Sequence, residues 1–272
     1  MGRGKATFWQ RAFGGAVVVC AVAYGLNLAL SEVQPGNLWS LGYGIAATVF
    51  LLGVFLLGVR RRALRLASKY RLGAAHSWLS FHIYGGGLFL LLTLMHSGFR
   101  LPTGAVTTWL WALSLWTVAS GLVGLAIQTW IPRVLASGLS TEVLYERIPE
   151  MVTHLRGRAE ALVETCDEAV QTLYSRQLAP AFAAPHWRWI YFYDITGGSR
   201  TRLKEFRYLE GKLGPEEREK LEELEQLYRT KLEMDAHYTL QRPLRLWLFT
   251  HVPTSLALLA FLALHLFSVL YY

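Results

Sequence analysis

Cysteine is scarce in this chain, and the motifs that bind several common cofactors are missing. Cys20 and Cys166 are its two cysteines, which is too few to ligate an iron–sulfur cluster or a cysteine-based zinc ion. No Gly-x-Gly-x-x-Gly pattern follows a strand-like segment, and no Gly-Lys-Ser or Gly-Lys-Thr phosphate loop is present. The sequence therefore lacks the usual signatures of dinucleotide and nucleotide binding.

Charged residues are also few, at 17% of the chain, and long stretches contain none. Hydrophobic residues make up 53% of the chain and form five runs of about twenty residues, the length that crosses a bilayer core. These runs are 13–30, 38–59, 78–99, 107–131 and 246–272. Basic residues precede the first run, as in a secretory signal, but no good small-residue cleavage site follows, so we interpret it as a helix. The sequence predicts an all-α membrane protein with five transmembrane helices.

Acidic residues are nearly missing outside the segment 133–242. That part of the chain contains one acidic residue, Glu32, and eleven basic residues. Ten of these eleven fall on one side of the membrane when the N-terminus is cytoplasmic, and Arg100 alone falls outside. Because basic loops stay in the cytoplasm, the sequence predicts a multi-pass protein of a bacterial inner membrane whose C-terminus lies outside. The formal net charge of +8 then reflects membrane topology and not nucleic-acid binding.

A long hydrophilic insert separates the last two transmembrane helices. On this interpretation, residues 1–132 hold transmembrane helices one to four, 133–243 form a cytoplasmic and mostly helical insert, and 244–272 form the fifth transmembrane helix. The insert is predicted to begin with an amphipathic helix over 140–178, capped by Ser140-Thr141-Glu142, broken at 179–185 and followed by a charged helix over 216–240.

Aromatic residues cluster in the middle of this insert, whereas its histidines are dispersed. The aromatic residues are Trp187, Trp189, Tyr191, Phe192 and Tyr193. They can form a hydrophobic core, an interfacial belt against the bilayer or a docking face for another protein, and we favour the two surface roles. The histidines His154, His186 and His237 are expected to be ordinary surface or core residues.

Two pairs of histidines with the same separation lie inside the apolar runs. His82 and His96 are in the third run, and His251 and His265 are in the fifth. A separation of fourteen residues corresponds to a helical rise of about 21 Å and returns to nearly the same helix face. An imidazole is costly in the hydrocarbon interior, so its presence there indicates a functional partner. Haem iron is the natural partner for an imidazole in this position.

The predicted topology brings the four histidines to two matching depths. The third and fifth helices both run outward, so His82 can face His251 near the cytoplasmic side and His96 can face His265 near the outer side. This arrangement predicts two haems b. Iron with imidazole on both faces has no open position, which favours electron transfer over substrate binding. The alternative is that all four are hydrogen-bonded core histidines.

Small and basic residues near these helices complete the candidate haem sites. Gly44 and Gly58 on the second helix repeat the fourteen-residue period and can admit the haem planes. Arg100, four residues after His96 on the same helical face, is the outer candidate for binding haem propionates. The inner candidates are Arg71, His76 and Arg245, while the run Arg60 to Arg62 is better explained as an anchor to lipid phosphates.

The paired His-x13-His helices, with a glycine period on an adjacent helix, resemble the dihaem b-type cytochromes of quinone-linked respiratory complexes. The likeness is greatest to the haem-bearing four-helix half of cytochrome b from bc-type complexes, and it covers the second to fifth helices. It implies axial ligands at His82, His96, His251 and His265 and haem-admitting glycines at Gly44 and Gly58. The chain departs from that family in its first helix, its long insert and its lack of the quinol-site sequence Pro-Glu-Trp-Tyr.

These observations predict a cytochrome b subunit of a membrane respiratory complex. It would carry electrons across the membrane between the quinone pool and a partner redox subunit, either a c-type cytochrome or an iron–sulfur protein. The alternatives are a self-contained haem reductase of ferric iron or superoxide, and a non-redox membrane scaffold. The residues at which a quinone could bind are Lys69, Tyr70, His76 and Ser80 inside and Ser97, Arg100 and Tyr271 outside, and the sequence selects none of them.

Overall fold

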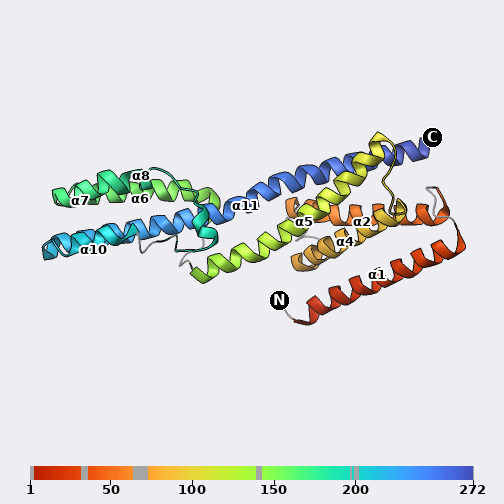
Figure 1. The fold of residues 1–272 in the computed structure, drawn as a ribbon, viewed down its shortest axis with the longest axis horizontal. Coiled ribbons are helices and arrows are strands. Elements are labelled where there is room, and N and C mark those ends of the chain that lie inside the picture. Colours follow the sequence, from red (N-terminus) through yellow and green to blue (C-terminus); the bar gives the residue numbers. More distant parts are fainter. Residues whose placement is uncertain are drawn as a thin grey trace. The chain divides into compact units, whose positions relative to one another are not determined.

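The computed structural model of the chain describes residues 3–31, 36–63, 73–138, 143–196, 198 and 202–271. Every regular element in this described part is helical (Figure 1). Among the described residues, five helices are long and apolar enough to cross a membrane, which agrees with the predicted number and indicates a multi-pass membrane protein. They are α1 (Arg3–Leu30), α2 (Leu38–Arg62), α4 (Ala75–His96), α5 (Ala105–Gly138) and α11 (Pro215–Tyr271).

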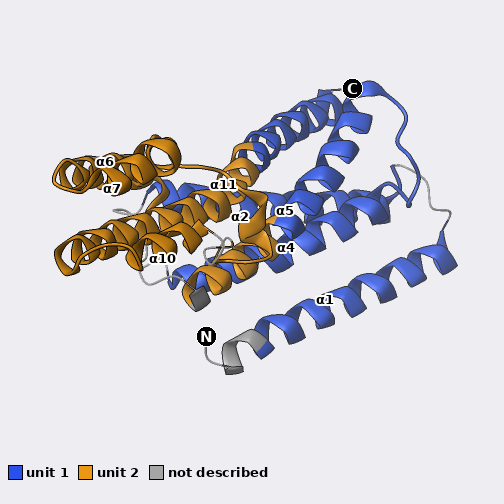
Figure 2. Cartoon of the chain, turned by 60° about the vertical axis from the view of Figure 1, so that its left-hand side comes forward, with its two compact units in different colours: residues 1–123, 250–272 blue, residues 124–249 orange. Residues whose placement is uncertain are grey.

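Two compact units divide the chain (Figure 2). Unit 1 comprises Met1–Val123 and Thr250–Tyr272, and unit 2 comprises Gly124–Phe249. Helices α5 and α11 each contribute residues to both units. All four histidines of the two pairs belong to unit 1.

Apolar contacts hold α2 against α4 in unit 1. The buried core of this unit contains Tyr43, Ala47, Leu51, Phe89, Leu92 and Met95, together with Leu258 and Leu262 of α11. Asn37 caps α2, since its side chain accepts a hydrogen bond from the backbone N–H of Ser40 at 2.6 Å. Gly53 allows the ring of Phe81 to approach closely, because a Cβ at this glycine would lie 2.9 Å from the ring. These contacts position α4, the helix that carries His82 and His96.

Two spanning helices have ends that differ from the sequence prediction. Helix α4 ends at His96 and not at 99, because Gly98 (φ 61°) and Phe99 (φ 57°) adopt left-handed backbone that stops a right-handed helix. Helix α11 is one continuous element from Pro215 to Tyr271, whereas the sequence predicted a charged helix and a separate transmembrane helix. Each internal proline costs one backbone hydrogen bond, which a long helix supported by its neighbours can tolerate.

In unit 2, a layer of short helices packs along α10 (Lys204–Glu210) and the first half of α11 (Figure 1). The layer consists of η1 (Tyr145–Arg147), α6 (Ile148–Val163), α7 (Glu168–Leu173), η2 (Tyr174–Leu178) and α8 (Ala179–Phe182). The hydrophobic core between them includes Val143, Ile148, Val152, Leu155, Ala159, Phe182, Phe206, Leu221 and Leu224. The apolar periodicity that predicted an amphipathic helix here is therefore the buried face of α6.

The predicted boundaries of that amphipathic helix were wrong at two points. A turn at 164–167 interrupts the run expected over 140–178, with Asp167 at the N-cap position of α7. The chain then stays helical to Phe182, although a break was expected from 179. The expected cap, Ser140 to Glu142, lies outside the described residues.

Candidate functional site

The four histidines of the apolar runs come together as two pairs across α4 and α11. The ring centroids of His82 and His251 lie 6.3 Å apart, with 70° between the ring planes. The ring centroids of His96 and His265 also lie 6.3 Å apart, with 78° between the planes. The pairing expected from matched depths is therefore present in the fold.

The separation within each pair fits a single metal atom between the two rings. With a metal–nitrogen bond of about 2.0 Å and about 1.1 Å from the nitrogen to the ring centre, two imidazoles on opposite sides of a metal have centres about 6.2 Å apart. A direct hydrogen bond of about 2.9 Å between the rings would instead bring the centres to about 5 Å. The observed 6.3 Å in both pairs agrees with the first arrangement.

The kind of metal centre is limited by the number of protein ligands. Within the part of the chain that the structure describes, no group of three or more histidine, cysteine, aspartate or glutamate side chains gathers around a common point. A porphyrin brings four nitrogens of its own, so haem iron needs only two axial imidazoles from the protein. Two-histidine sites therefore suit haem better than a bare metal ion.

Backbone carbonyls of α2 orient the two histidines of α4. The Nδ1 of His82 lies 3.1 Å from the carbonyl oxygen of Val54, and the Nδ1 of His96 lies 2.8 Å from that of Ser40. Because a carbonyl oxygen only accepts hydrogen bonds, each Nδ1 carries the proton and donates it. The Nε2 lone pair is then the one that can bind a metal, and metal-binding histidines typically donate their other ring N–H in this way.

A serine on α5 plays the same part for the third histidine. The Nδ1 of His251 lies 2.8 Å from the Oγ of Ser120, and the same hydroxyl donates to the carbonyl oxygen of Thr117 at 3.0 Å. With its proton used there, the hydroxyl accepts the Nδ1–H of His251. The imidazole of His251 is buried, with 9% exposed. Ser120 is not among the candidates from the sequence analysis, because no pattern links a serine on one helix to a histidine 131 positions later.

The glycines expected to admit haem planes differ in their surroundings. A Cβ at Gly44 would lie 2.9 Å from the ring of His96, so only glycine fits there without a shift of that ring. A Cβ at Gly58 would meet no atom within 4 Å. On α5, a Cβ at Gly121 would lie 3.6 Å from His251 Cε1. Gly44 therefore acts directly on a histidine, and Gly58 borders open space.

Arg100, the outer candidate for binding propionates, does not lie on the helix that carries His96. Arg100 is exposed and follows the turn that ends α4 at His96, so the prediction that these two residues share a helical face is wrong. The left-handed residues between them redirect the backbone. Among the inner candidates, Arg71 lies outside the described residues.

Two further inner candidates lie in different environments. Arg245, in unit 2, forms an ion pair with Glu146 at 3.1 Å, and its guanidinium lies 4.6 Å from the ring centre of Tyr145. His76 lies in the first turn of α4, and its Nε2 is buried without a hydrogen-bond partner among the described residues. Of the inner candidates that the structure describes, His76 is the one with a buried polar atom that lacks a hydrogen-bond partner.

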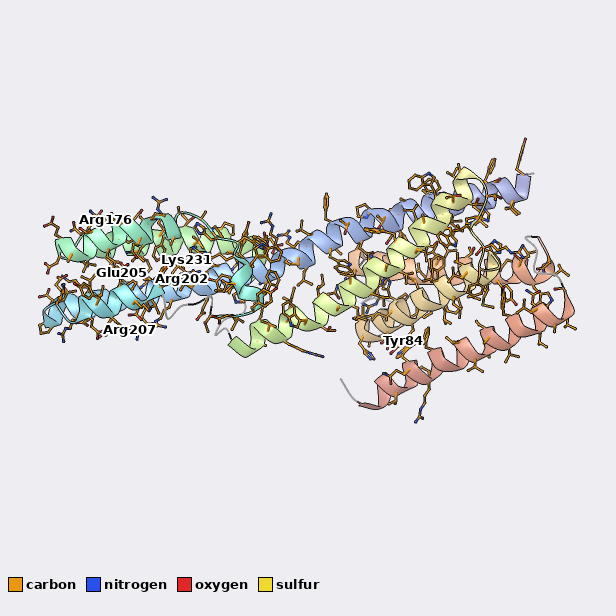
Figure 3. All side chains as sticks on the ribbon, in the orientation of Figure 1. Tyr84, Arg176, Arg202, Glu205, Arg207 and Lys231 are labelled. Carbon is orange, nitrogen blue, oxygen red and sulfur yellow. The ribbon has the colours of Figure 1, made fainter. Side chains whose placement is uncertain are left out.

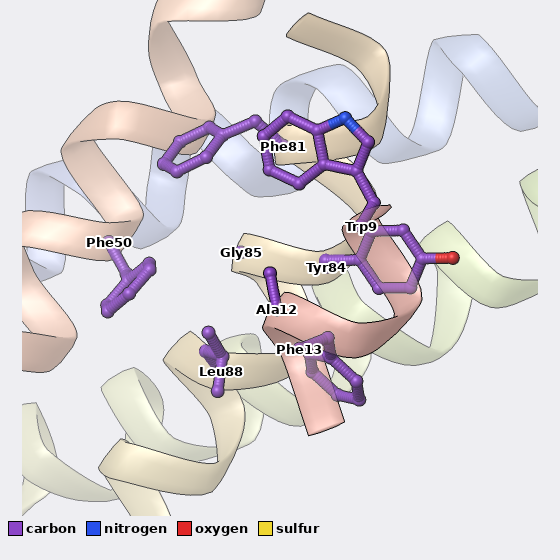
Figure 4. A pocket seen from close by; sticks show the side chains of 8 residues that line it. All are labelled: Trp9, Ala12, Phe13, Phe50, Phe81, Tyr84, Gly85 and Leu88. Carbon is purple, nitrogen blue, oxygen red and sulfur yellow. The ribbon is translucent and has the colours of Figure 1, made fainter. Parts of the chain in front are cut away.

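An apolar cavity of about 170 Å³ lies beside α4 in unit 1 (Figure 4). Its lining comes from α1, α2 and α4 and consists of Trp9, Ala12, Phe13, Phe50, Phe81, Tyr84, Gly85 and Leu88. None of the four paired histidines lines it. Lys69 and Tyr70 lie outside the described residues, and no other quinone-site candidate lines this cavity, so the structure also selects no quinone site.

Comparison with known proteins adds no relative to this description. No protein-family model, no curated protein and no solved structure matches the chain.

Proposed function

We propose that the chain is a dihaem b-type cytochrome of a respiratory membrane, which passes electrons between the quinone pool and a partner redox subunit. The partner would be a c-type cytochrome or an iron–sulfur protein. The observation that carries this proposal is the repeated geometry of the four histidines. The two histidines on each helix are fourteen residues apart, and the two that face each other across α4 and α11 have ring centres 6.3 Å apart in both cases. Four unrelated core histidines would have no reason to repeat a spacing that suits a metal.

The residues of the chain would hold, orient and shield the cofactors. His82 and His251 would ligate one haem, and His96 and His265 the other. Hydrogen bonds from Nδ1 to α2 and α5 fix the ring orientation and leave Nε2 as the metal-binding nitrogen. Bound haem supplies one-electron exchange at its iron, with a potential that depends on burial and on hydrogen bonds to the axial ligands.

The spacing of the pairs suits transfer from one side of the membrane to the other. Fourteen residues of helix separate His82 from His96, a rise of about 21 Å in a hydrocarbon core about 30 Å thick. Each pair would then lie in its own leaflet. Since two imidazoles fill both axial positions of each iron, oxygen and substrates would have no coordination site, and the partner subunit would supply the substrate chemistry.

Purified chain should contain about two haems b, and its reduced-minus-oxidised absorption spectrum should show low-spin b-type bands. The measurements are the haem-to-protein ratio and a potentiometric titration of those bands. A colourless preparation with intact helices would exclude the proposal and favour the non-redox scaffold. Reduction of ferric iron or superoxide by the chain without a partner would favour the self-contained reductase.

Replacement of Gly44 by valine should remove the haem held by His96 and His265 while the other haem stays. The new side chain begins 2.9 Å from the ring of His96, and that ring cannot move aside without losing its hydrogen bond to the Ser40 carbonyl. Haem content should fall from about two to about one per chain. Gly42→Val is the matched control, because a Cβ at Gly42 meets nothing within 4 Å. Equal haem loss in both variants would point to a general defect of α2.

A further inference from the structure

Residues 187–193, which include the 3-10 helix η3 (Trp189–Phe192), divide their aromatic side chains between interior and surface. Tyr191 is buried in unit 2, with 1% exposed, whereas Trp189 is 66% and Tyr193 is 92% exposed. Trp187 and Phe192 contact Trp189, with ring centroids 4.5 Å and 5.6 Å from its own. We call Trp187, Trp189, Phe192 and Tyr193 the aromatic platform. The core role considered from sequence thus applies to Tyr191 alone, and the surface roles apply to the platform.

Buried polar contacts tie the start of the platform to α11. Lys231 and Asp235, whose side chains are 0% and 2% exposed, form an ion pair at 2.6 Å; Figure 3 labels Lys231. Asp235 also accepts a hydrogen bond from the backbone N–H of His186 at 2.7 Å. The backbone N–H of Arg188 donates to the hydroxyl of Thr239 at 3.1 Å. These buried contacts fix the segment on α11. The exposure of its rings is therefore not the result of a loosely held loop.

Two ring contacts place the platform beside the ends of the apolar helices. Trp130 stacks on Phe192 with centroids 6.1 Å apart and 8° between the planes, and it lies at the end of the apolar part of α5. The guanidinium of Arg242 lies 5.9 Å from the ring centre of Trp187, and it precedes the last apolar run of α11. The platform therefore lies beside the predicted ends of the apolar runs of α5 and α11.

We propose that the aromatic platform docks on the phospholipid headgroup layer of the membrane that the chain spans. Tryptophan and tyrosine favour this layer because one part of each ring is apolar and another forms hydrogen bonds. Trp189 and Tyr193 are exposed beside the half-buried Trp187 and Phe192, and large apolar side chains grouped on a surface mark an interaction site.

The charges around the platform suit lipid phosphates. Arg133 and Arg242 are exposed and can bind phosphate groups at the membrane surface. Of the nearby acidic residues, Glu146 is paired with Arg245 at 3.1 Å. The carboxylate of Asp194 accepts hydrogen bonds from the backbone N–H groups of 196 and 198 in its own turn. The arginines therefore remain in excess, and continuity with the helix ends favours lipid over a protein partner.

Docking of the platform on lipid can be tested with a nitroxide spin label attached to the full chain at Tyr193→Cys. Both native cysteines are replaced by alanine, and the protein is placed in phospholipid nanodiscs. Tyr208→Cys is the matched control, because Tyr208 is a 65% exposed tyrosine of the same unit, and its ring contacts Lys212 in the turn after α10. Collisions with oxygen, which concentrates in lipid, are compared with collisions with a water-soluble nickel chelate. We expect the oxygen-to-nickel collision ratio to be severalfold higher at 193 than at 208.

Equal nickel accessibility at the two labels would overturn the proposal. So would shielding of position 193 that requires a second protein and not lipid. If Tyr193→Cys fails to fold, the native chain still provides a test. Fluorescence of Trp189, taken as the difference between the wild type and Trp189→Phe, should be quenched by brominated lipid, and an unquenched difference signal would contradict lipid docking.

Discussion

Replacement of His82 by alanine is expected to remove one of the two haems and to leave the other intact. The two pairs are separated by about 21 Å along α4, so loss of one axial ligand should not disturb the distant pair. Haem content should fall from about two to about one per chain, and one of two midpoint potentials should vanish from the redox titration. His96→Ala should remove the complementary potential, so the two variants together assign each potential to a site.

A histidine outside the pairs provides the control for this experiment. His154 is exposed on α6, and His154→Ala should keep both haems and both potentials. Retention of two low-spin centres in either ligand variant would show that the ligands are wrongly assigned. Loss of both haems in each variant would instead show that the two centres depend on each other for binding.

Replacement of Lys231 by methionine is expected to cause the largest loss of stability of any single change in unit 2. It leaves the Asp235 carboxylate, which is 2% exposed, without its ion-pair partner in an apolar surrounding. Breaking a buried pair in this way costs about 3–5 kcal/mol. Amide exchange measured by mass spectrometry over α6 and the first half of α11 should therefore become roughly 150- to 5000-fold faster.

A double variant separates the pair from the rest of the core. Lys231→Met with Asp235→Leu removes both charges, and replacing a buried pair by apolar side chains is often close to neutral. The backbone N–H of His186 then loses its acceptor, which costs about 1–3 kcal/mol. Exchange in the double variant should thus be slower than in Lys231→Met. Equally fast exchange in both would mean that the cavity left by Lys231, and not the unpaired charge, causes the instability.

The pH dependence of the single variant has a definite sign. Burial raises the pKa of the Asp235 carboxyl above its ordinary value, and Lys231 is the main group that opposes this rise. Without Lys231, the pKa of Asp235 in the folded chain should lie still further above its value in the unfolded chain. A raised pKa gives stability that is present below the unfolded pKa and is lost as the pH rises through the folded pKa. The exchange difference between Lys231→Met and the wild type should therefore shrink as the pH is lowered.

Much of the membrane architecture could be predicted because it depends on features that are linear in the sequence. The five spanning helices follow from apolar runs of sufficient length. The pairing of His82 with His251 and of His96 with His265 follows from equal spacing and parallel direction of two helices. Both arguments use only helix rise and residue order, and neither requires knowledge of side-chain orientation.

Features that depend on local backbone or on packing between helices could not be predicted in this way. Arg100 was assigned to the face of His96 on the assumption that the helix continued, but two left-handed residues end it. Helix α11 continues through its internal prolines because packed neighbours support it. The low helix propensity of proline does not include this support. The contact between Ser120 and His251 depends on the rotation of α5 about its axis, and no periodicity in one helix determines that rotation relative to another.

The histidines of α4 and the buried histidine of α11 differ in how their orientation is encoded. Val54 and Ser40 accept the imidazole protons through main-chain oxygens, so many side chains at position 54 would preserve the bond as long as α2 keeps its register. His251 is hydrogen-bonded to a side-chain hydroxyl, which only a few residue types carry. If the proposed haems are present, substitutions at position 120 would therefore change the hydrogen bonding of one axial ligand alone, and the redox potential of that haem could be adjusted independently of the other.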